Sequence, residues 1–134
     1  MAAEKIGSMS GQSTVKTLPA NETSPRFETS AAGAGTLAGA EVQFMATYSA
    51  EIRPNGFLYG ECPNAGVIMT SDGVATFRAS GTGSFTEDGG ATFKGIVYFE
   101  TSAPSLSSLN GAAVVYNWDV DAEGGATWEL WQWK

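Results

Sequence analysis

The feature that most constrains the fold of this chain is a turn signal that recurs roughly every ten to fifteen residues. Each signal contains Pro, or pairs Gly with Asn, Asp, Glu or another Gly, and Gly permits the positive φ that tight turns need. The signals lie at Pro19, Asn55-Gly56, Asp72-Gly73, Asp88-Gly89-Gly90, Asn110-Gly111 and Glu123-Gly124-Gly125. The segments between them are rich in Val, Ile, Thr, Phe, Tyr and Trp, which predicts short β-strands joined mostly by hairpins.

Eight segments between these signals have the length and composition of strands. Alternation of apolar and polar residues, which places successive side chains on opposite faces, is clearest over residues 41–53 and 91–101. Pro63 predicts a bulge or a break in the fourth segment, because proline cannot donate to a strand ladder. Residues 102–109 are the one link that is not a hairpin, and Pro104 predicts a single helical turn there. We expect strands over residues 6–17, 26–37, 41–53, 57–69, 74–85, 91–101, 111–120 and 126–133.

Eight antiparallel strands with short links can close into a cylinder, which removes the exposed edges of the sheet. We therefore predict an all-β chain that forms a single closed eight-stranded antiparallel β-barrel, mostly a meander, over residues 6–134. Residues 1–5 are expected to be disordered, and residues 18–25 to form a loop that contains Pro19. A two-sheet sandwich is the competing arrangement. A barrel of this size encloses either a small molecule or only its own side chains.

The charge and composition of the chain argue against several classes of function. Among 134 residues, 14 are acidic and 7 basic, and a net charge of −7 argues against a nucleic-acid partner. Histidine is absent, which excludes Ser-His-Asp and Cys-His catalysis and His-ligated metal sites. We therefore expect no metal and no cofactor. The single cysteine, Cys62, cannot form an internal disulfide and is expected to be a buried, unreactive thiol.

The chain carries no recognisable signal for export or membrane insertion. Its first residues lack the apolar segment of a signal peptide, and no apolar run approaches the ~20 residues that span a bilayer. These features predict a cytoplasmic protein with no membrane partner.

All four tryptophans fall in the last two predicted strands. In the final strand Trp131 and Trp133 share one face, and Trp128 lies on the other. Such residues either line a cavity for an apolar ligand or form ordinary core or an oligomer interface. The candidate ligand-binding residues are Tyr98, Glu100, Tyr116, Asn117 and Trp131.

Two carboxylates in predicted strands are the weak candidates for catalysis. Glu61 and Glu100 sit inside apolar stretches, and a carboxyl that faces the lumen would have its pKa raised by desolvation, which suits proton transfer. Arg78, in the middle of a strand, is a candidate partner for either one. The alternative is that all three side chains point to solvent, because Asp, Glu and Arg are seldom buried without a partner.

Several motifs together resemble a family of small uncharacterised bacterial proteins. They are Tyr59-Gly60-Glu61-Cys62, Gly66-Val67-Ile68-Met69-Thr70, Phe77, Gly81, Gly83, Phe93-Lys94-Gly95, Leu109-Asn110-Gly111 and Trp131-Gln132-Trp133-Lys134. That family is similar in fold to allene oxide cyclase, so the resemblance implies an allene-oxide-cyclase-like eight-stranded barrel. The wider superfamily includes cofactor-free cyclases, which hold a flexible apolar substrate in a reactive conformation. No catalytic signature of those enzymes transfers residue by residue to this chain, and a shared fold does not establish an activity.

Three functions are compatible with these observations. The first is a barrel that binds a small apolar molecule in its lumen. The second is a cofactor-independent cyclase or isomerase of the allene oxide cyclase type, in which Glu61 or Glu100 transfers the proton. The third is a non-catalytic structural barrel that forms a homodimer or another homo-oligomer. Whether the protein is an enzyme is left open by the sequence.

Overall fold

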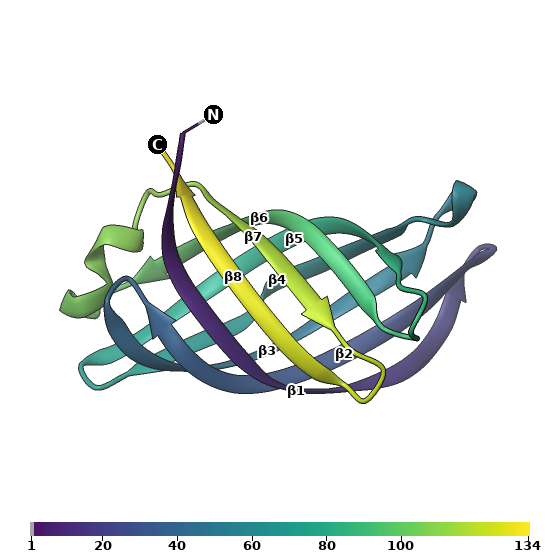
Figure 1. Ribbon diagram of the computed structural model, residues 1–134, viewed down its shortest axis with the longest axis horizontal. Coiled ribbons are helices and arrows are strands. Elements are labelled where there is room, and N and C mark those ends of the chain that lie inside the picture. The colour runs from purple at the N-terminus through teal and green to yellow at the C-terminus, as the bar shows by residue number, and fades with distance from the viewer. Residues whose placement is uncertain (1) are drawn as a thin grey trace.

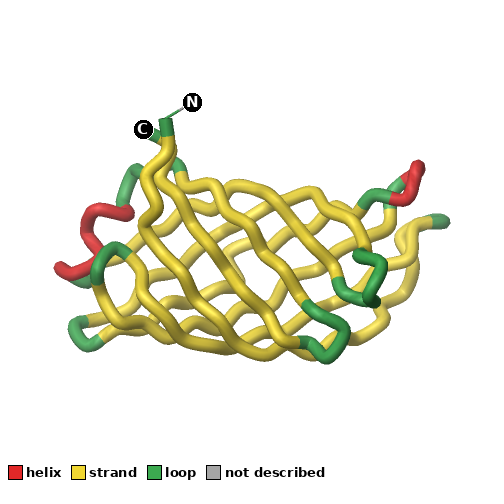
Figure 2. Tube along the Cα trace, viewed as in Figure 1, coloured by secondary structure: helices red, strands yellow, loops and turns green. Residues whose placement is uncertain are grey.

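The computed structural model describes residues 2–134, and it is a closed barrel of eight antiparallel strands (Figure 1). Strands make up most of the chain, and two short 3-10 helices lie at opposite ends of the barrel (Figure 2). The elements are β1 (Ala3–Asn21), β2 (Ser24–Leu37), β3 (Ala40–Ile52), η1 (Pro54–Gly56), β4 (Leu58–Thr70), β5 (Gly73–Phe85), β6 (Ala91–Thr101), η2 (Pro104–Leu109), β7 (Val114–Val120) and β8 (Gly125–Trp133). The predicted fold class is therefore confirmed.

Each strand pairs with the next one along the chain, and β8 pairs with β1 to close the cylinder. The closing register runs from Ala3 opposite Trp133 to Gln12 opposite Gly125. In Figure 1, β1 and β8 cross the front of the barrel side by side, and both chain ends lie at the same end of it. This pairing rules out the two-sheet sandwich.

The closing strand also orders most of the segment that we expected to be disordered. Residues 1–5 include the start of β1, which begins at Ala3 and bonds to β8. The backbone N–H of Lys134 donates to the carbonyl of Ala2 at 2.9 Å, and the Lys134 ammonium lies 3.4 Å from Glu4. The disorder expectation is wrong for residues 3–5, because β8 supplies their backbone partners. Met1 lies outside the described residues.

Pro19 and Pro63 both lie within strands, and the sequence predicted the effect of Pro63 but not that of Pro19. The predicted loop over residues 18–25 is wrong, because β1 continues through Pro19 to Asn21 and only residues 22–23 form a turn. This outer part of β1 pairs with β2 alone, so its other edge has no strand to which the missing N–H of Pro19 would donate. The β1–β2 register also shifts between Leu18 and Asn21, around Pro19. Pro63 lies in a bulge, as predicted, and the β4–β5 register shifts between Cys62 and Gly66.

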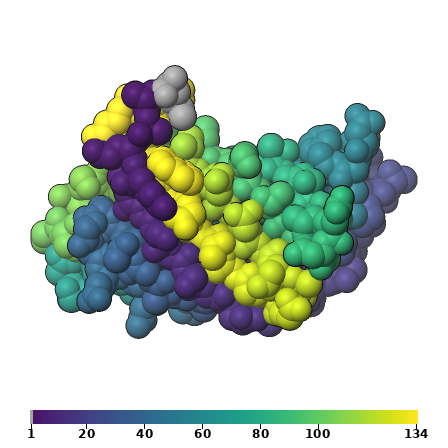
Figure 3. Space-filling model, in the orientation of Figure 1, coloured from purple at the N-terminus to yellow at the C-terminus, as the bar shows by residue number. Residues whose placement is uncertain are grey.

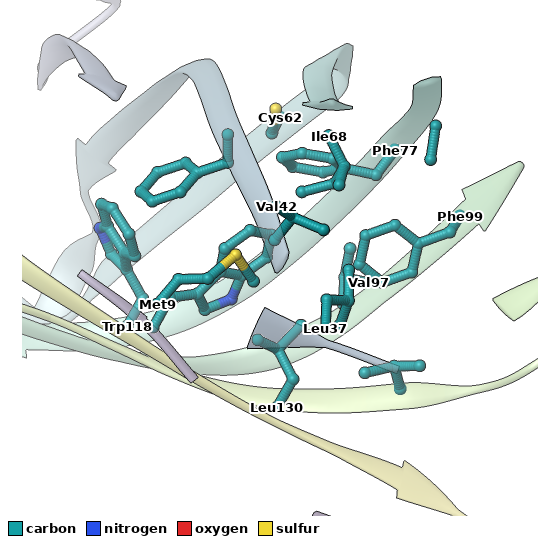
Figure 4. Packing of buried hydrophobic residues seen from close by; sticks show 14 of the residues in the cluster. Met9, Leu37, Val42, Cys62, Ile68, Phe77, Val97, Phe99, Trp118 and Leu130 are labelled. Carbon is teal, nitrogen blue, oxygen red and sulfur yellow. The ribbon is translucent and has the colours of Figure 1, made fainter. Parts of the chain in front are cut away.

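The inward-facing side chains fill most of the barrel. Leu106 and Leu109 of η2 are buried and cover one end, and at the other end Phe27 and Phe85 meet edge to face with ring centroids 6.5 Å apart. Between the ends, aromatic rings and aliphatic side chains point toward one another (Figure 4). The large buried residues of the lumen include Met9, Leu37, Val42, Phe44, Leu58, Ile68, Phe77, Phe93, Val97, Phe99, Val114, Trp118, Trp128 and Leu130.

Glycines on the inner face make room for the rings. Phe77 and Trp128 approach with ring centroids 5.2 Å apart, and the Phe77 ring lies directly over Gly66. A Cβ at Gly66 would lie 2.2 Å from a Phe77 ring atom, which is far inside contact distance. At Gly60, also on the inner face of β4, the nearest atom to such a Cβ is 3.4 Å away. Dense aromatic packing in this barrel therefore depends on which inner positions lack side chains.

We predict that Gly66→Ala destabilises the protein by about 1–3 kcal/mol, because the Phe77 ring must leave its rotamer or the strand must shift. Urea unfolding followed by circular dichroism measures the change. Gly60→Ala is the matched control on the same strand and face, with an expected change within about 0.5 kcal/mol. Equal destabilisation by the two substitutions would contradict this account of the packing.

Candidate functional site

A cavity of about 50 Å³ lies in the barrel beside the β4 bulge, and it is the candidate functional site. Its wall is almost entirely apolar, and most of the large side chains in it are aromatic. The lining residues are Ala31, Phe44, Ala46, Tyr48, Gly60, Glu61, Cys62, Phe77, Ala79, Phe93, Tyr116, Trp118 and Trp128.

Gly60 of the cavity wall belongs to a row of positions without side chains. Gly60, Gly81 and Gly95 stand directly opposite one another on β4, β5 and β6, and Gly95 in turn is opposite Tyr116 of β7. The Tyr116 phenol lies over this row, with its hydroxyl oxygen 2.6 Å from where a Cβ at Gly81 would be. Burial raises the pKa of the Tyr116 hydroxyl, which is therefore neutral at physiological pH. A single ring thus covers a stretch of bare backbone.

A second phenol is held in place by a hydrogen bond. The indole Nε1–H of Trp118 donates to the Tyr48 hydroxyl at 3.0 Å, and the two rings meet edge to face. Burial also raises the pKa of Tyr48. Phe93 packs on the other side of Tyr48, with ring centroids 5.9 Å apart. These contacts fix Tyr48, whereas no hydrogen bond among residues 2–134 holds the Tyr116 hydroxyl.

Cys62 borders the cavity at the start of the bulge. The residue is 5% exposed, and burial raises the pKa of its thiol, with backbone groups of Ala65 and Thr47 acting in the opposite direction. A raised pKa keeps the thiol protonated and weakly nucleophilic near neutral pH. Cys62 therefore contributes a small apolar surface to the cavity wall.

Of the five expected ligand-binding residues, the structure places only Tyr116 on the cavity wall. Tyr98 is 50% exposed on the outer face of β6, and Glu100 is exposed on the same face. Asn117 and Trp131 are half-buried and also face outward, because they alternate with the inward-facing Tyr116 and Leu130. Most of the expected set therefore lies outside the lumen.

The three candidate catalytic side chains also present their charged groups to the outside. Arg78 and Glu100 pair across the outer face at 3.9 Å, with 63% and 81% of their side chains exposed. Glu61 borders the cavity, but its carboxylate accepts a hydrogen bond at 2.8 Å from the exposed Tyr59 hydroxyl. These residues therefore place no carboxylate in the lumen that could transfer a proton there.

Further aromatic residues line the cavity. Trp118 and Trp128 belong to the tryptophans whose alternatives included a cavity lining, whereas Tyr48 and Phe93 were not among the candidates. A signal for Tyr48 was present, because residues 41–53 alternate cleanly and Tyr48 shares its face with Val42 and Phe44, which are both buried. Residues 91–101 carry apolar side chains on both faces, so alternation alone did not identify Phe93 as the inward residue.

Comparison with known proteins identifies the fold. No family model matches the chain, and no curated protein matches it. A conserved protein of unknown function from Rhodopseudomonas palustris has 17% identity and a TM-score of 0.81 over 98% of this chain and 96% of the other. A protein of unknown function from Clostridium acetobutylicum has 14% identity and a TM-score of 0.82, with both chains fully covered. A β-barrel-like protein from Acinetobacter baumannii has 14% identity and a TM-score of 0.80 over 99% and 96%.

These neighbours are uncharacterised bacterial proteins with a barrel fold, and at such low identity they establish the fold alone. They do not bear on the expected likeness to allene oxide cyclase. Across residues 2–134, no helix has the length and apolar character that crossing a bilayer demands.

The buried phenols predict a loss of stability at high pH. Burial raises the pKa of Tyr116 in the folded state, so below about pH 10 the phenol is protonated in both states and its contribution is fully present. As the pH rises further, the unfolded chain loses this proton first, and the free energy of unfolding falls by about 1.4 kcal/mol per pH unit. Tyr116→Phe removes the ionising group and should make the decline shallower by that amount.

Urea unfolding of both proteins from pH 8 to above pH 10 measures the two slopes. The substitution breaks no hydrogen bond among the described residues, so the stabilities below pH 10 should be similar. Identical slopes would show that Tyr116 is not buried as the structure has it.

Proposed function

We propose that this barrel binds a small, mainly apolar molecule in its central cavity. The observation that carries the proposal is an apolar, aromatic-lined cavity at Gly60, next to Gly81 and Gly95, where the Tyr116 ring is the only side chain over bare backbone. Elsewhere the lumen is densely filled. A cavity lined by aromatic rings with a few polar groups is the usual form of a small-molecule site.

The size of the cavity restricts the ligand. A volume of about 50 Å³ is far below what a fatty acid needs, and an engineered protein cavity of ~150 Å³ is known to hold a benzene-sized molecule. A ligand with a single aromatic ring therefore fits only if one wall side chain moves. Tyr116 is the candidate, because its hydroxyl has no hydrogen bond among the described residues and its ring covers bare backbone.

The lining also suggests what the ligand carries. Displaced from the glycine row, the Tyr116 hydroxyl is available to donate to an acceptor on the ligand, and the ring edges around it offer apolar contact. A planar molecule with one polar group, such as a phenol or an indole, matches this lining. The acidic chain has no cation among the cavity residues, so an anionic ligand is disfavoured.

We do not assign a reaction to this site. A cofactor-independent cyclase or isomerase needs a group that transfers a proton in the lumen. The carboxylates of Glu61 and Glu100 are exposed on the outer face, and the raised pKa values of the cavity phenols and thiol keep these groups protonated near neutral pH, so none of them is available as a base. Binding is therefore the function that the geometry favours.

We predict saturable binding of phenol or indole, with a Kd on the order of 0.1–1 mM for a ligand of this size. Trp118 and Trp128 line the cavity, so tryptophan fluorescence and titration calorimetry should both report the interaction. Ala79→Leu fills the cavity and should weaken binding at least ~10-fold. Ser80→Leu adds the same side chain at the next, exposed position and should leave the Kd unchanged.

Palmitate is the second ligand in this experiment, and we expect no binding because the cavity is too small. Failure of every small aromatic ligand to give a saturable signal would overturn the proposal. So would equal affinity in the Ala79→Leu and wild-type proteins, because binding would then lie outside the lumen.

A further inference from the structure

The outer face of β6, β7 and β8 carries a group of large apolar side chains that are exposed or half-buried in the described part of the chain. We call it the aromatic stripe, and its residues are Ile96, Tyr98, Val115, Trp131 and Trp133. Ile96 stands opposite Val115, which stands opposite Trp131, so the three form a row across neighbouring strands. Tyr98 and Trp133 follow on the same face and are 50% and 51% exposed. The outer surfaces of β7 and β8 are on the visible side of Figure 3.

Charged residues of both signs surround the aromatic stripe. Lys5 stands opposite Trp131 with its ammonium 5.8 Å from the indole centroid, and it pairs with Glu129 at 2.8 Å. Arg78 is opposite Tyr98 and pairs with Glu100. Lys134 pairs with Glu4, but alternation places both on the opposite face of the sheet from Trp133. Two of the four ion pairs formed within residues 2–134 therefore border the stripe.

The rest of the surface is strongly negative. Three of the seven basic residues lie around the stripe, namely Lys5, Arg78 and Lys94. Most of the fourteen acidic residues lie elsewhere on the chain. Two copies of such a negatively charged molecule repel one another in most relative orientations. The repulsion is smallest when each copy presents a face on which positive and negative charges balance. The stripe with its ion pairs is such a face.

We propose that the aromatic stripe is the interface of a homodimer, with a second copy of this chain as its occupant. A two-fold interface brings the same surface of both copies together, so each needs its own cations and anions at the rim. Arg78 and Glu100 satisfy that condition, since either group in one copy can pair with its opposite in the other. Tyr and Trp are the residues most enriched at the centres of such interfaces, and Arg is enriched with them.

A second apolar area on the barrel lacks these features. Met45, Val67, Met69 and Val74 are neighbours on the outer face of β3, β4 and β5, and Met45 and Val74 are 55% and 53% exposed. None of these residues is aromatic, and no ion pair among residues 2–134 joins side chains of that area. It therefore supplies a control surface of matching exposure.

Sedimentation velocity over a range of protein concentrations tests the proposal. We expect the wild-type protein to be a dimer, and the double variant Tyr98→Glu/Trp133→Glu to raise the dimer Kd at least ~100-fold, because each change removes a central aromatic contact and adds a like charge. Met45→Glu/Val74→Glu adds the same charge at positions of similar exposure and should remain dimeric. Circular dichroism and urea unfolding establish that each variant is folded.

Cysteine cross-linking provides a second readout that needs no charge change. Val115→Cys lies in the middle of the aromatic stripe, and mild oxidation should give a disulfide-linked dimer, whereas Gln43→Cys on the exposed outer face of β3 should not. The native Cys62 is buried and does not compete. A wild-type monomer up to ~100 µM, a dimer that survives the Tyr98 and Trp133 substitutions, or equal dissociation of the control variant would each overturn the proposal.

Discussion

Pairing of β1 with β8 is the constraint on which the rest of this structure depends. An open sheet of eight strands has two faces on which apolar residues can be placed and two edges that must be protected. Closure from Ala3 to Gln12 removes the edges over that length and creates one inner face that all eight strands share. Every second residue of each strand must then fit into one common volume, so large side chains on one strand require small ones on another.

The distribution of glycine and aromatic residues answers that requirement. Phe77 lies over Gly66, and Tyr116 lies over Gly81 and Gly95. Each ring therefore occupies the space that a side chain at the glycine position would need. The central cavity lies at Gly60, the glycine of the row that the Tyr116 ring leaves uncovered, whereas Gly81 and Gly95 lie under that ring. The candidate site is therefore part of the packing pattern of the barrel rather than an addition to it.

Much of the fold could be predicted because turns and alternation are local signals. The predicted segment 91–101 coincides with β6, and Pro63 marks the bulge in β4. The segment around Pro19 could not be predicted correctly, since a proline is compatible with a strand only when no partner needs its N–H, and that depends on where β8 begins. The disorder expected for residues 3–5 was wrong for a related reason, because their partners come from the far end of the chain.

The site was harder to predict than the fold, because its position depends on which face of each strand is inward. Tyr98, Glu100 and Trp131 were chosen for their residue types and lie on the outer face, whereas Phe93 and Trp128 point inward. In β6 and β8 both faces carry apolar residues, so alternation does not distinguish the lumen from an exposed apolar surface. If the aromatic stripe is a dimer interface, apolar residues are needed on the outer face of these strands as well as on the inner one. The two faces then look alike in the sequence.

The incomplete closure of the barrel has a consequence for aggregation. Beyond Gln12 and Ser13, β1 extends past β8 and pairs only with β2, which leaves one margin of this ribbon without a neighbour. Exposed strand margins recruit other chains into growing sheets, and proline and lysine are the residues that most often prevent this. Lys16 and Pro19 both lie in this overhang, where the missing amide proton interrupts the ladder that an incoming strand would need. Pro19 and Lys16 therefore stand at the margin of β1 that barrel closure leaves unpaired.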